Sequence, residues 1–569
     1  MQLPVRKHSH EADIGGPTSE DDNESMRNRI ERVTADINDL ESFYNIEISP
    51  QRSARLKDYY KGELAGLEVV PFDGLDQQSK VDYLLLKNYL KRRLRQLDLD
   101  ATKDKTIEPL LPFAVTIIRL CEDRQHMKPI DGQRAAEDVH EIAQRAVSTE
   151  GEIKAQKIKI DKTSAFRAAR TVDRLREHLA EWFGYFNGYD PMFSWWVVEP
   201  YTKVNTALRD LAETIRTELV GIIPGDKDAI VGDPIGREGL LVELEAEKIP
   251  YTPEELINIG EKEYEWCLKE MKTASHDLDA GYGDNWKAAL EHVKNLYVPP
   301  GKQTEVIRYL AEEAVDFITQ RDMVTIPPIA NECWRMFMMS AAQQKVSPFF
   351  LGGDDIIVSY PTSAMDHEDK LMSMRGNNPH FSRSTVFHEL LPGHHLQFHY
   401  IVRSKPYRYP VFTTPFSIEG WSLYWELILW DLGFAASPEN RIGMLFWRMH
   451  RCARIIFSLK FHLGQMTPQE CIDMLVDMVG HEKSTAEGEV RRSFAGDYSP
   501  LYQAGYLIGG LQLYALSKEL VVSGQMSEKK FHDRFLKENT MPIEIFRALI
   551  RKQPLNRDFE SSWRFYQDS

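Results

Sequence analysis

The stretch from Phe387 to Gln397 reads FHELLPGHHLQ and places three histidines and one carboxylate within eight residues. Imidazole nitrogen and carboxylate oxygen are ligands that Zn²⁺ takes in a tetrahedral site, and a catalytic site leaves one position free for water. A glutamate beside the first ligand can act as general base on that water, as in the H-E-x-x-H helix. We therefore predict a zinc site with His388 as a ligand and Glu389 as the base. The alternative, core histidines around a buried glutamate, is disfavoured because an unpaired buried carboxylate is costly.

The spacing after His388 departs from H-E-x-x-H, because Pro392 stands four positions on and the histidines follow at six and seven. An unbroken helix with 3.6 residues per turn would point His394 away from His388. Pro392 removes a backbone donor and Gly393 permits unusual backbone angles, so we expect the helix to bulge. A bulge that absorbs two residues would turn His394 toward His388, and we predict His394 as the second ligand. His395 is the alternative, but it would lie about 10 Å along a straight helix.

A third ligand is expected on the following helix, in the segment 418–426, which reads IEGWSLYWE. Glu419 and Glu426 are seven positions apart and therefore share a helix face. One carboxylate can bind the metal while the other holds the second ring nitrogen of a histidine ligand. We assign Glu419 to the metal and Glu426 to the supporting role. Packing within an aromatic helix is the alternative role for Glu419.

The two motifs together resemble the domain-of-unknown-function 885 family, a bacterial and fungal family of predicted zinc metallopeptidases. The resemblance rests on HExxPGHHLQ at 388–397 and EGWxLYxE at 419–426, and it spans most of residues 50–560. More distantly, the second motif is similar to the second-ligand helix of thimet-oligopeptidase-like gluzincins, which carry H-E-x-x-H on the preceding helix. Residues 388–394 also resemble the extended motif of the dipeptidyl peptidase III family with one proline added. That similarity supports a bulged helix and His394 as ligand.

The gluzincin resemblance also implies a donor to the oxyanion that develops on the substrate carbonyl, often a tyrosine from a C-terminal helix. The segment 503–509 resembles the family's Gln-Ala-x-x-Tyr-x-x-Gly element, shortened by one residue before the tyrosine. We predict Tyr506 as this donor, with Tyr498 and Tyr502 as alternatives and packing as the other role for each. Further candidates to bind a substrate carboxylate or donate a hydrogen bond, against surface or helix-pairing roles, are Arg448, Arg454, Arg491, Arg492 and His462.

Helical periodicity of apolar residues runs through most of the chain, for example at Leu90, Leu94 and Leu97. We therefore expect a mainly α fold, a large multi-helical body of the kind that the gluzincin resemblance implies. The exception is the β-branched segment 355–360. A strand there could hold an extended peptide at the lip of a cleft, or it could be a short buried core strand.

The domain organisation follows from length and composition. At 569 residues the chain exceeds the roughly 250–300 residues that one core usually supports. We predict a disordered polar tail at 1–25, an N-terminal helical lobe at 26–220, a Gly- and Pro-rich connection at 221–236 and a catalytic helical lobe at 237–569.

Helix boundaries are predicted at four places. Thr252 and Thr467 each precede a proline and stand three residues before a glutamate, which predicts two capping boxes. Gly480 is expected to end the second of these helices. Ser382 or Ser384 is expected to cap the helix that carries His388.

Composition excludes several classes of partner. The formal net charge is −16, and no basic run is combined with aromatics in a nucleic-acid motif, so we expect no nucleic-acid partner. The five cysteines are scattered, which favours a reducing compartment. There is no apolar leader and no apolar run of about 18 residues, so we expect a soluble, cytoplasmic protein without a membrane partner. The acidic charge mildly favours substrates with a free amine or basic residues. Oligomeric state is not predicted.

The function predicted from these residues is zinc-dependent hydrolysis of amide bonds in short peptides, with Glu389 as general base and Tyr506 as oxyanion donor. Two other functions are kept open. One is a metal enzyme that hydrolyses or forms an amide in a biosynthetic metabolite, and the other is a non-catalytic helical scaffold with a vestigial site.

Overall fold

The computed structural model describes residues 24–566 except 227, 346, 348 and 497. The described chain is mainly α-helical, which confirms the predicted fold class, and its only strands are β1 (Arg335–Met338) and β2 (Asp355–Val358). Most of the predicted tail, residues 1–23, lies outside the described residues. Its last two residues are ordered just before the first helix: Ser25 caps that helix, and Glu24 forms ion pairs with two of its arginines.

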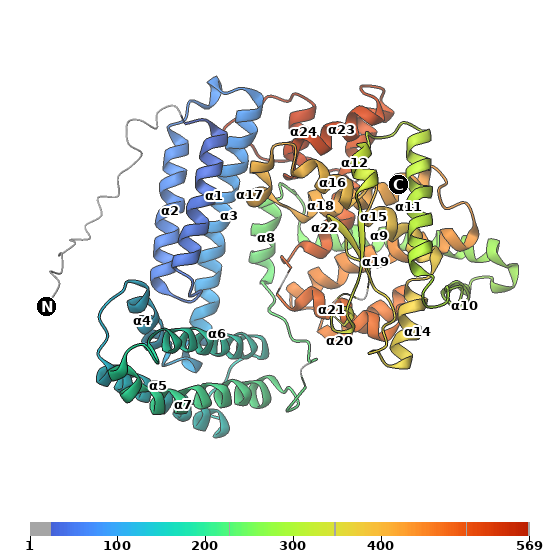
Figure 1. The fold of residues 1–569 in the computed structure, drawn as a ribbon. Helices are drawn as coiled ribbons and strands as arrows, with labels where there is room; N and C mark the ends of the chain where they lie inside the picture. Colours follow the sequence, from blue (N-terminus) through green and yellow to red (C-terminus); the bar gives the residue numbers. More distant parts are fainter. Residues whose placement is uncertain (1–23, 227, 346, 348, 497, 567–569) are drawn as a thin grey trace.

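The N-terminal part forms two groups of helices (Figure 1). Three long helices stand side by side: α1 (Met26–Phe43), α2 (Pro50–Glu68) and α3 (Gln77–Ile107). Four more lie across their lower end: α4 (Ala114–Gln125), α5 (Gly132–Lys154), α6 (Lys162–Phe186) and α7 (Pro191–Thr214). The buried apolar side chains of α4–α7 form a core of their own, whereas those of α1, α2 and the first half of α3 join the core of the C-terminal body. The predicted lobe boundary at 221–236 stays a prediction.

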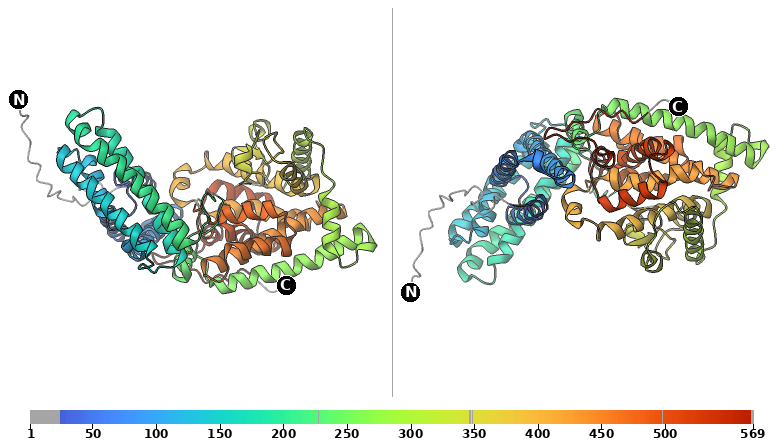
Figure 2. Two further views of the ribbon diagram at one scale, coloured as in Figure 1. Left: turned by 90° about the horizontal axis from the view of Figure 1, so that it is seen from below. Right: turned by 90° about the horizontal axis from the view of Figure 1, so that it is seen from above.

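The C-terminal body contains the remaining helices. Its larger elements are α8 (Gly236–Ala246), α9 (Pro253–Leu278), α10 (Trp286–Lys294), α11 (Gln303–Gln320), α14 (His367–Gly376), α15 (Pro379–Glu389), α16 (His394–Ile401), α18 (Pro415–Asp431), α19 (Pro438–His462), α20 (Pro468–Met474), α21 (Lys483–Phe494), α22 (Tyr502–Ser517), α23 (Glu528–Glu538) and α24 (Ile543–Ile550). Short helices are α12 (Pro328–Glu332), α13 (Ala341–Gln344) and α17 (Tyr409–Phe412). Figure 2 shows the orange and red helices α18, α19 and α22 between the light green α9 on one side and yellow-green residues 335–376 on the other.

Short helical turns complete the described structure. The 3₁₀ turns are η1 (Phe72–Gly74), η2 (Glu108–Leu110), η4 (Ala280–Tyr282) and η5 (Pro406–Arg408). Three π-helical turns extend α7, α20 and α22: η3 (Ile215–Val220), η6 (Leu475–Val479) and η7 (Lys518–Val522). No described helix combines the length and hydropathy that a membrane crossing requires.

The helix signals read from the sequence are mostly confirmed. Thr252 and Thr467 form capping boxes with the glutamates three residues on. Gly480 ends its helix with φ of 82°, in the left-handed region that favours glycine. The predicted cap of α15 is wrong, because its N-cap is Asn378, whose side chain accepts hydrogen bonds from two backbone N–H groups. The helix therefore begins at Pro379, and both serines lie inside it.

Two glycines bring α18 and α22 close together at the centre of the body. A Cβ added to Gly420 would lie 2.7 Å from the backbone of Gly509, and one added to Gly509 would lie 2.3 Å from the Phe416 carbonyl oxygen. Any larger side chain would force the helices apart. This close packing brings Glu419 on α18 within hydrogen-bonding distance of Tyr502 on α22.

The predicted strand at 355–360 is observed as β2, over Asp355–Val358. It pairs in parallel with β1, a strand that was not predicted. Ile357 also forms an antiparallel β-bridge with Leu351. Ile356 and Val358 are fully buried, whereas Ile357 borders the cavity described below. The segment therefore contributes to the core, as one of the two alternatives predicted, and also to the cavity wall, while its role in holding a peptide stays a prediction.

Candidate metal centre

The chain between α15 and α16 is built to accommodate two extra residues. The Gly393 N–H donates to the Phe387 carbonyl (3.0 Å) and the Leu396 N–H to the Leu390 carbonyl (3.3 Å), each across six residues where an α-helix bonds across four. A Cβ on Gly393 would lie 1.9 Å from the His388 carbonyl oxygen, so this close approach requires glycine. The predicted two-residue insertion is confirmed, although the helix breaks rather than bulges, with a cis peptide bond before Pro392.

Side chains of α18 satisfy the carbonyl groups that the break leaves without helical partners. The Ser422 hydroxyl donates to the His388 carbonyl (2.9 Å), and the Trp421 indole N–H donates to the Pro392 carbonyl (2.9 Å). Because buried backbone carbonyls require partners, these bonds fix the broken segment against α18. The motif histidines and Glu419 are thereby held in one arrangement.

His388, His394 and Glu419, the three predicted ligands, lie together and are buried. Glu419 Oε2 is 3.1 Å from His394 Nε2 and 3.5 Å from His388 Nε2, and all three ligand atoms lie within 4.8 Å of one another. Ligand bonds of about 2.0–2.2 Å would place tetrahedral zinc ligands about 3.4 Å apart. The donor set of two nitrogens and one oxygen therefore fits a Zn²⁺ ion with one position open.

Neighbouring groups orient each ligand. Glu426 Oε1 accepts a hydrogen bond from His388 Nδ1 (2.7 Å), so Nε2 faces Glu419, which is the supporting role predicted for Glu426. The Tyr502 hydroxyl donates to Glu419 Oε1. Burial alone would lower the pKa of His388, but its bonds to Glu419 and Glu426 raise that pKa to about 9. Burial likewise opposes ionisation of Glu419, but the two histidines outweigh it and hold the pKa of Glu419 well below its usual range.

His395 points to different partners. Its Nδ1 is 3.0 Å from the Asp354 carbonyl and its Nε2 is 2.9 Å from the Ala330 carbonyl. Both ring nitrogens are therefore engaged by the backbone of the β1–β2 region and α12. Of the two histidines considered for the second ligand, only His394 lies in the cluster.

The cluster opens onto a cavity of about 300 Å³. Glu389 lines it, with Oε2 4.0 Å from His394 Nε2, and burial raises the pKa of its carboxyl group. Apolar walls come from Phe349, Phe350, Leu351, Ile357, Phe398, Ile418 and Trp447. The cavity therefore combines an apolar wall with many polar and charged side chains that converge on the cluster, which is more polar than the usual small-ligand site.

A family model and two solved structures each match most of the chain. The family model described as "Bacterial protein of unknown function (DUF885)" matches residues 45–550. This chain belongs to the DUF885 family. The family resemblance read from the motifs is thus confirmed, while the link to gluzincin peptidases stays a prediction. No curated protein matches the sequence.

Two solved structures resemble this DUF885 protein. One is described as "a putative lipoprotein of unknown function from Shewanella oneidensis", with TM-score 0.67 and 16% identity, covering 93% of this chain and 100% of that one. The other is described as "the putative lipoprotein from Colwellia psychrerythraea", with TM-score 0.56 and 15% identity, covering 89% and 91%. At such identities the similarity extends to the fold alone.

The three candidate tyrosines of this DUF885 protein all line the cavity. The Tyr502 hydroxyl group already donates a hydrogen bond to Glu419. Tyr506 stacks near His388, with ring centroids 6.1 Å apart, and its oxygen accepts a hydrogen bond from Arg492 (3.3 Å). Burial raises the pKa of Tyr506 far above neutrality, so the phenol stays protonated and its own hydrogen is free to donate. Tyr498 packs against Tyr502 and under the Arg492 guanidinium.

The candidate cations divide into two groups. Arg454 and Arg492 line the cavity, and so does Arg451, which the sequence reasoning missed. Arg448 instead pairs with Glu263 on α9, and Arg491 donates to backbone carbonyls. His462 is buried, and burial lowers its pKa to about 4, but it is not among the described residues that line the cavity. Arg451 stands three residues from both Arg448 and Arg454, so helical spacing alone could not show which of them reaches the cavity.

The position of Gly352 predicts a sensitive contact within the site. A Cβ added there would lie 2.1 Å from Glu389 Oε2 and 3.0 Å from Glu389 Cα. Gly352→Ala is therefore expected to displace the Glu389 carboxylate and lower kcat by about 100-fold, as for other small displacements of reacting groups. Zinc content should stay unchanged, because no predicted ligand is touched.

The matched control is Gly184→Ala on α6, where an added Cβ meets nothing within 4 Å. Steady-state kinetics and metal analysis of both variants would check this prediction. Normal turnover in Gly352→Ala would show that the Glu389 carboxylate does not need its observed position.

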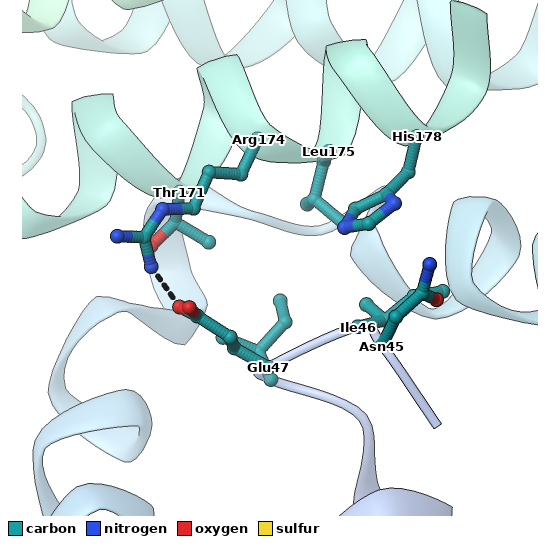
Figure 3. A pocket seen from close by; sticks show the side chains of 8 residues that line it. Asn45, Ile46, Glu47, Thr171, Arg174, Leu175 and His178 are labelled. Atoms are coloured by element: carbon teal, nitrogen blue, oxygen red, sulfur yellow. Dashed lines mark hydrogen bonds and ion pairs between the residues drawn. The ribbon is translucent and has the colours of Figure 1, made fainter. Parts of the chain in front are cut away.

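A second hollow lies in the N-terminal part, between the α1–α2 link and α6 (Figure 3). It measures about 60 Å³, and Glu47 forms an ion pair with Arg174 at its edge. Burial lowers the pKa of His178, which also faces it. With one histidine and one paired carboxylate, it lacks the ligand set found beside α18.

Proposed function

We propose that this protein hydrolyses amide bonds in short peptides with a Zn²⁺ ion held by His388, His394 and Glu419. The observation that carries the proposal is the position of Glu389, whose carboxylate borders the same cavity as the three candidate ligands, 4.0 Å from His394 Nε2. When bound, zinc would supply a Lewis acid that activates water and polarises a carbonyl group.

Glu389 would move the protons of the reaction. It is placed to accept a proton from the attacking water and to pass it to the nitrogen of the leaving amine. The described structure gives its carboxylate no ion pair shorter than 4.0 Å, in contrast to Glu419 and Glu426, which are engaged by histidines. Of the three carboxylates, Glu389 is therefore the one free for proton transfer.

Tyr506 would donate its O–H group to the carbonyl oxygen as negative charge develops there. Arg492 donates to the Tyr506 oxygen, which leaves the phenolic hydrogen available and makes it a stronger donor. Tyr502, the alternative, already donates to Glu419. These contacts support Tyr506 over Tyr502 in this role.

The size of the cavity supports small substrates. Its volume of about 300 Å³ is at the lower end of the roughly 300–1,000 Å³ typical of small-molecule sites. Such a space fits a few residues around the scissile bond and excludes a folded protein domain. Short peptides and small amides are therefore the substrates we propose.

The proposal is tested with purified protein by elemental analysis and by assays on dipeptides, tripeptides and metabolite-like amides. About one zinc per chain is expected, together with peptide hydrolysis that a chelator abolishes and added zinc restores. Turnover of metabolite-like amides alone would favour the biosynthetic alternative. A protein that binds no zinc and turns over neither panel would favour a non-catalytic scaffold.

A further inference from the structure

Three arginines form part of the wall of the same cavity. Arg451 and Arg454 extend from α19 and Arg492 from α21. Their exposed fractions are 4%, 1% and 7%, so each of these residues is more than nine-tenths buried. A buried cation is costly unless a negative charge pairs with it. The partners of these arginines therefore indicate whether the protein alone neutralises their charge.

Two of the arginines have carboxylate partners. Arg454 forms a two-pronged ion pair with Glu489, at 2.7 and 2.9 Å. Arg451 donates to Glu426 over 3.3 Å, but Glu426 also accepts the shorter bond from His388. One Glu426 carboxylate thus accepts hydrogen bonds from both His388 and Arg451.

Arg492 differs from both, because within the described part of the chain it forms no ion pair with a carboxylate at 4.0 Å or less. Its side chain donates to the neutral Tyr506 hydroxyl and packs on the face of the Tyr498 ring, 4.8 Å from Cζ. Glu489 attracts it only from beyond 4.0 Å, and that carboxylate is engaged by Arg454. Buried nitrogens also lack partners on all three arginines: Nε of Arg451, Nη1 of Arg454 and Nε of Arg492. The three arginines therefore carry more positive charge than their carboxylate partners neutralise, and some of their buried N–H groups have no acceptor.

These donors and their charge suit an anion. A planar guanidinium matches a carboxylate through paired N–H donors. The remaining carboxylates of the cavity, Glu389 and Glu419, belong to the metal centre. Tyr506 lies between the metal centre and the arginines. Its ring is near that of His388, and its centroid is 4.6 and 4.4 Å from the Cζ atoms of Arg451 and Arg454. An anion held by the arginines would therefore lie close to the reacting bond.

We propose that Arg492, with Arg451 and Arg454, binds the free α-carboxylate of the substrate. This inference rests on the proposed function and narrows its substrate class to short peptides or N-acyl amino acids that end in a free carboxylate next to the scissile amide. Hydrolysis would then release a C-terminal residue. The local charge of the wall thus outweighs the weak preference for basic substrates that the net charge of −16 suggested.

The test compares three probes: N-acetyl-alanyl-alanine, its C-terminal carboxamide, and N-acetyl-alanyl-glutamate α-carboxamide, whose carboxylate is on the side chain. Binding is measured by calorimetry to zinc-loaded Glu389→Gln protein, in which turnover is expected to be at least about 100-fold slower. The free acid is expected to bind about 10- to 100-fold more tightly than its carboxamide, as for a hydrogen-bonded charge. Equal binding of acid and carboxamide, or preference for the side-chain carboxylate, would overturn the proposal.

Variants in the same background locate the subsite. Arg492→Gln is expected to abolish the preference for the free acid, whereas Arg492→Lys should retain part of it. The matched control is Arg491→Gln, since the neighbouring Arg491 donates to the Lys345 and Asp228 carbonyls and should leave the preference intact. Circular dichroism checks folding, and the probe comparison in the parent protein decides the proposal even if Arg492→Gln unfolds.

Failures of the two proposals give different results. Hydrolysis of peptides by the wild-type protein without preference for a free carboxylate would remove only the arginine subsite. A carboxylate preference in binding, with no hydrolysis of any probe by the zinc-loaded wild type, would retain the subsite and remove the proposed hydrolysis.

Discussion

Replacing Glu389 with glutamine is expected to leave zinc binding intact and to lower kcat by about 10²- to 10⁴-fold, the usual contribution of a general acid–base group. Glutamine has nearly the same shape, so it can occupy the space beside Gly352 that Glu389 fills. Its amide cannot accept a proton from water at neutral pH. The predicted ligands His388, His394 and Glu419 are unchanged, so the metal content should stay the same.

The measurements are zinc stoichiometry and steady-state kinetics on the best substrate of the peptide panel. Glu247→Gln is the matched control, because Glu247 is also buried, burial raises its pKa to about 7, and it accepts a hydrogen bond from Thr414 outside the cavity. That variant should keep its kcat. Turnover of Glu389→Gln near the wild-type level would refute the general-base role, and loss of zinc would instead make Glu389 a ligand.

The sequence predicted the parts of the site that depend on local chemistry. Pro392 and Gly393 cannot continue an α-helix with His388, so a two-residue insertion followed from their backbone properties alone. The seven-residue spacing of Glu419 and Glu426 follows from helix geometry, and Glu426 indeed bonds His388. The capping boxes were equally predictable, because all their partners lie within four residues.

Features that depend on distant contacts were not predictable in this way. Arg448 and Arg451 are three residues apart on α19, yet Arg448 turns to Glu263 and Trp266 on α9 while Arg451 reaches the cavity. The rotation of α19 is set by its packing, including Gly443, where a Cβ would lie 2.2 Å from the His380 carbonyl oxygen. No periodicity within α19 encodes that contact.

The position of the loop that carries Gly352 was likewise not predictable from the sequence. Its position depends on the bridge between Leu351 and Ile357 and on the pairing of β2 with β1. Strand β1 was missed because its sequence, Arg-Met-Phe-Met, has no β-branched residue, whereas the equally short β2 reads Asp-Ile-Ile-Val. Consequently the contact between Gly352 and Glu389, which joins the β segment to the metal centre, became visible only in three dimensions.

The assignment of the second ligand leads to a sharp comparison between adjacent histidines. His394→Ala is expected to lower zinc affinity by more than about 100-fold, since removal of even the groups that orient a ligand costs about 10- to 100-fold. His395→Ala should retain zinc, because its ring nitrogens face the Asp354 and Ala330 carbonyls instead of the cluster. Loss of those contacts should cost about 1–3 kcal/mol of unfolding free energy.

Zinc affinity by chelator competition and unfolding in denaturant would separate the two effects within one pair of variants. The zinc-free His394→Ala protein is also expected to lose stability, because buried Glu419 then loses its bond with His394 Nε2, so zinc affinity is the measurement that distinguishes the two histidines. The opposite pattern, with zinc lost from His395→Ala and retained by His394→Ala, would move the second ligand by one residue. It would also mean that the break at Pro392 and Gly393 re-aims His395, contrary to the six-residue hydrogen bonds that now position His394.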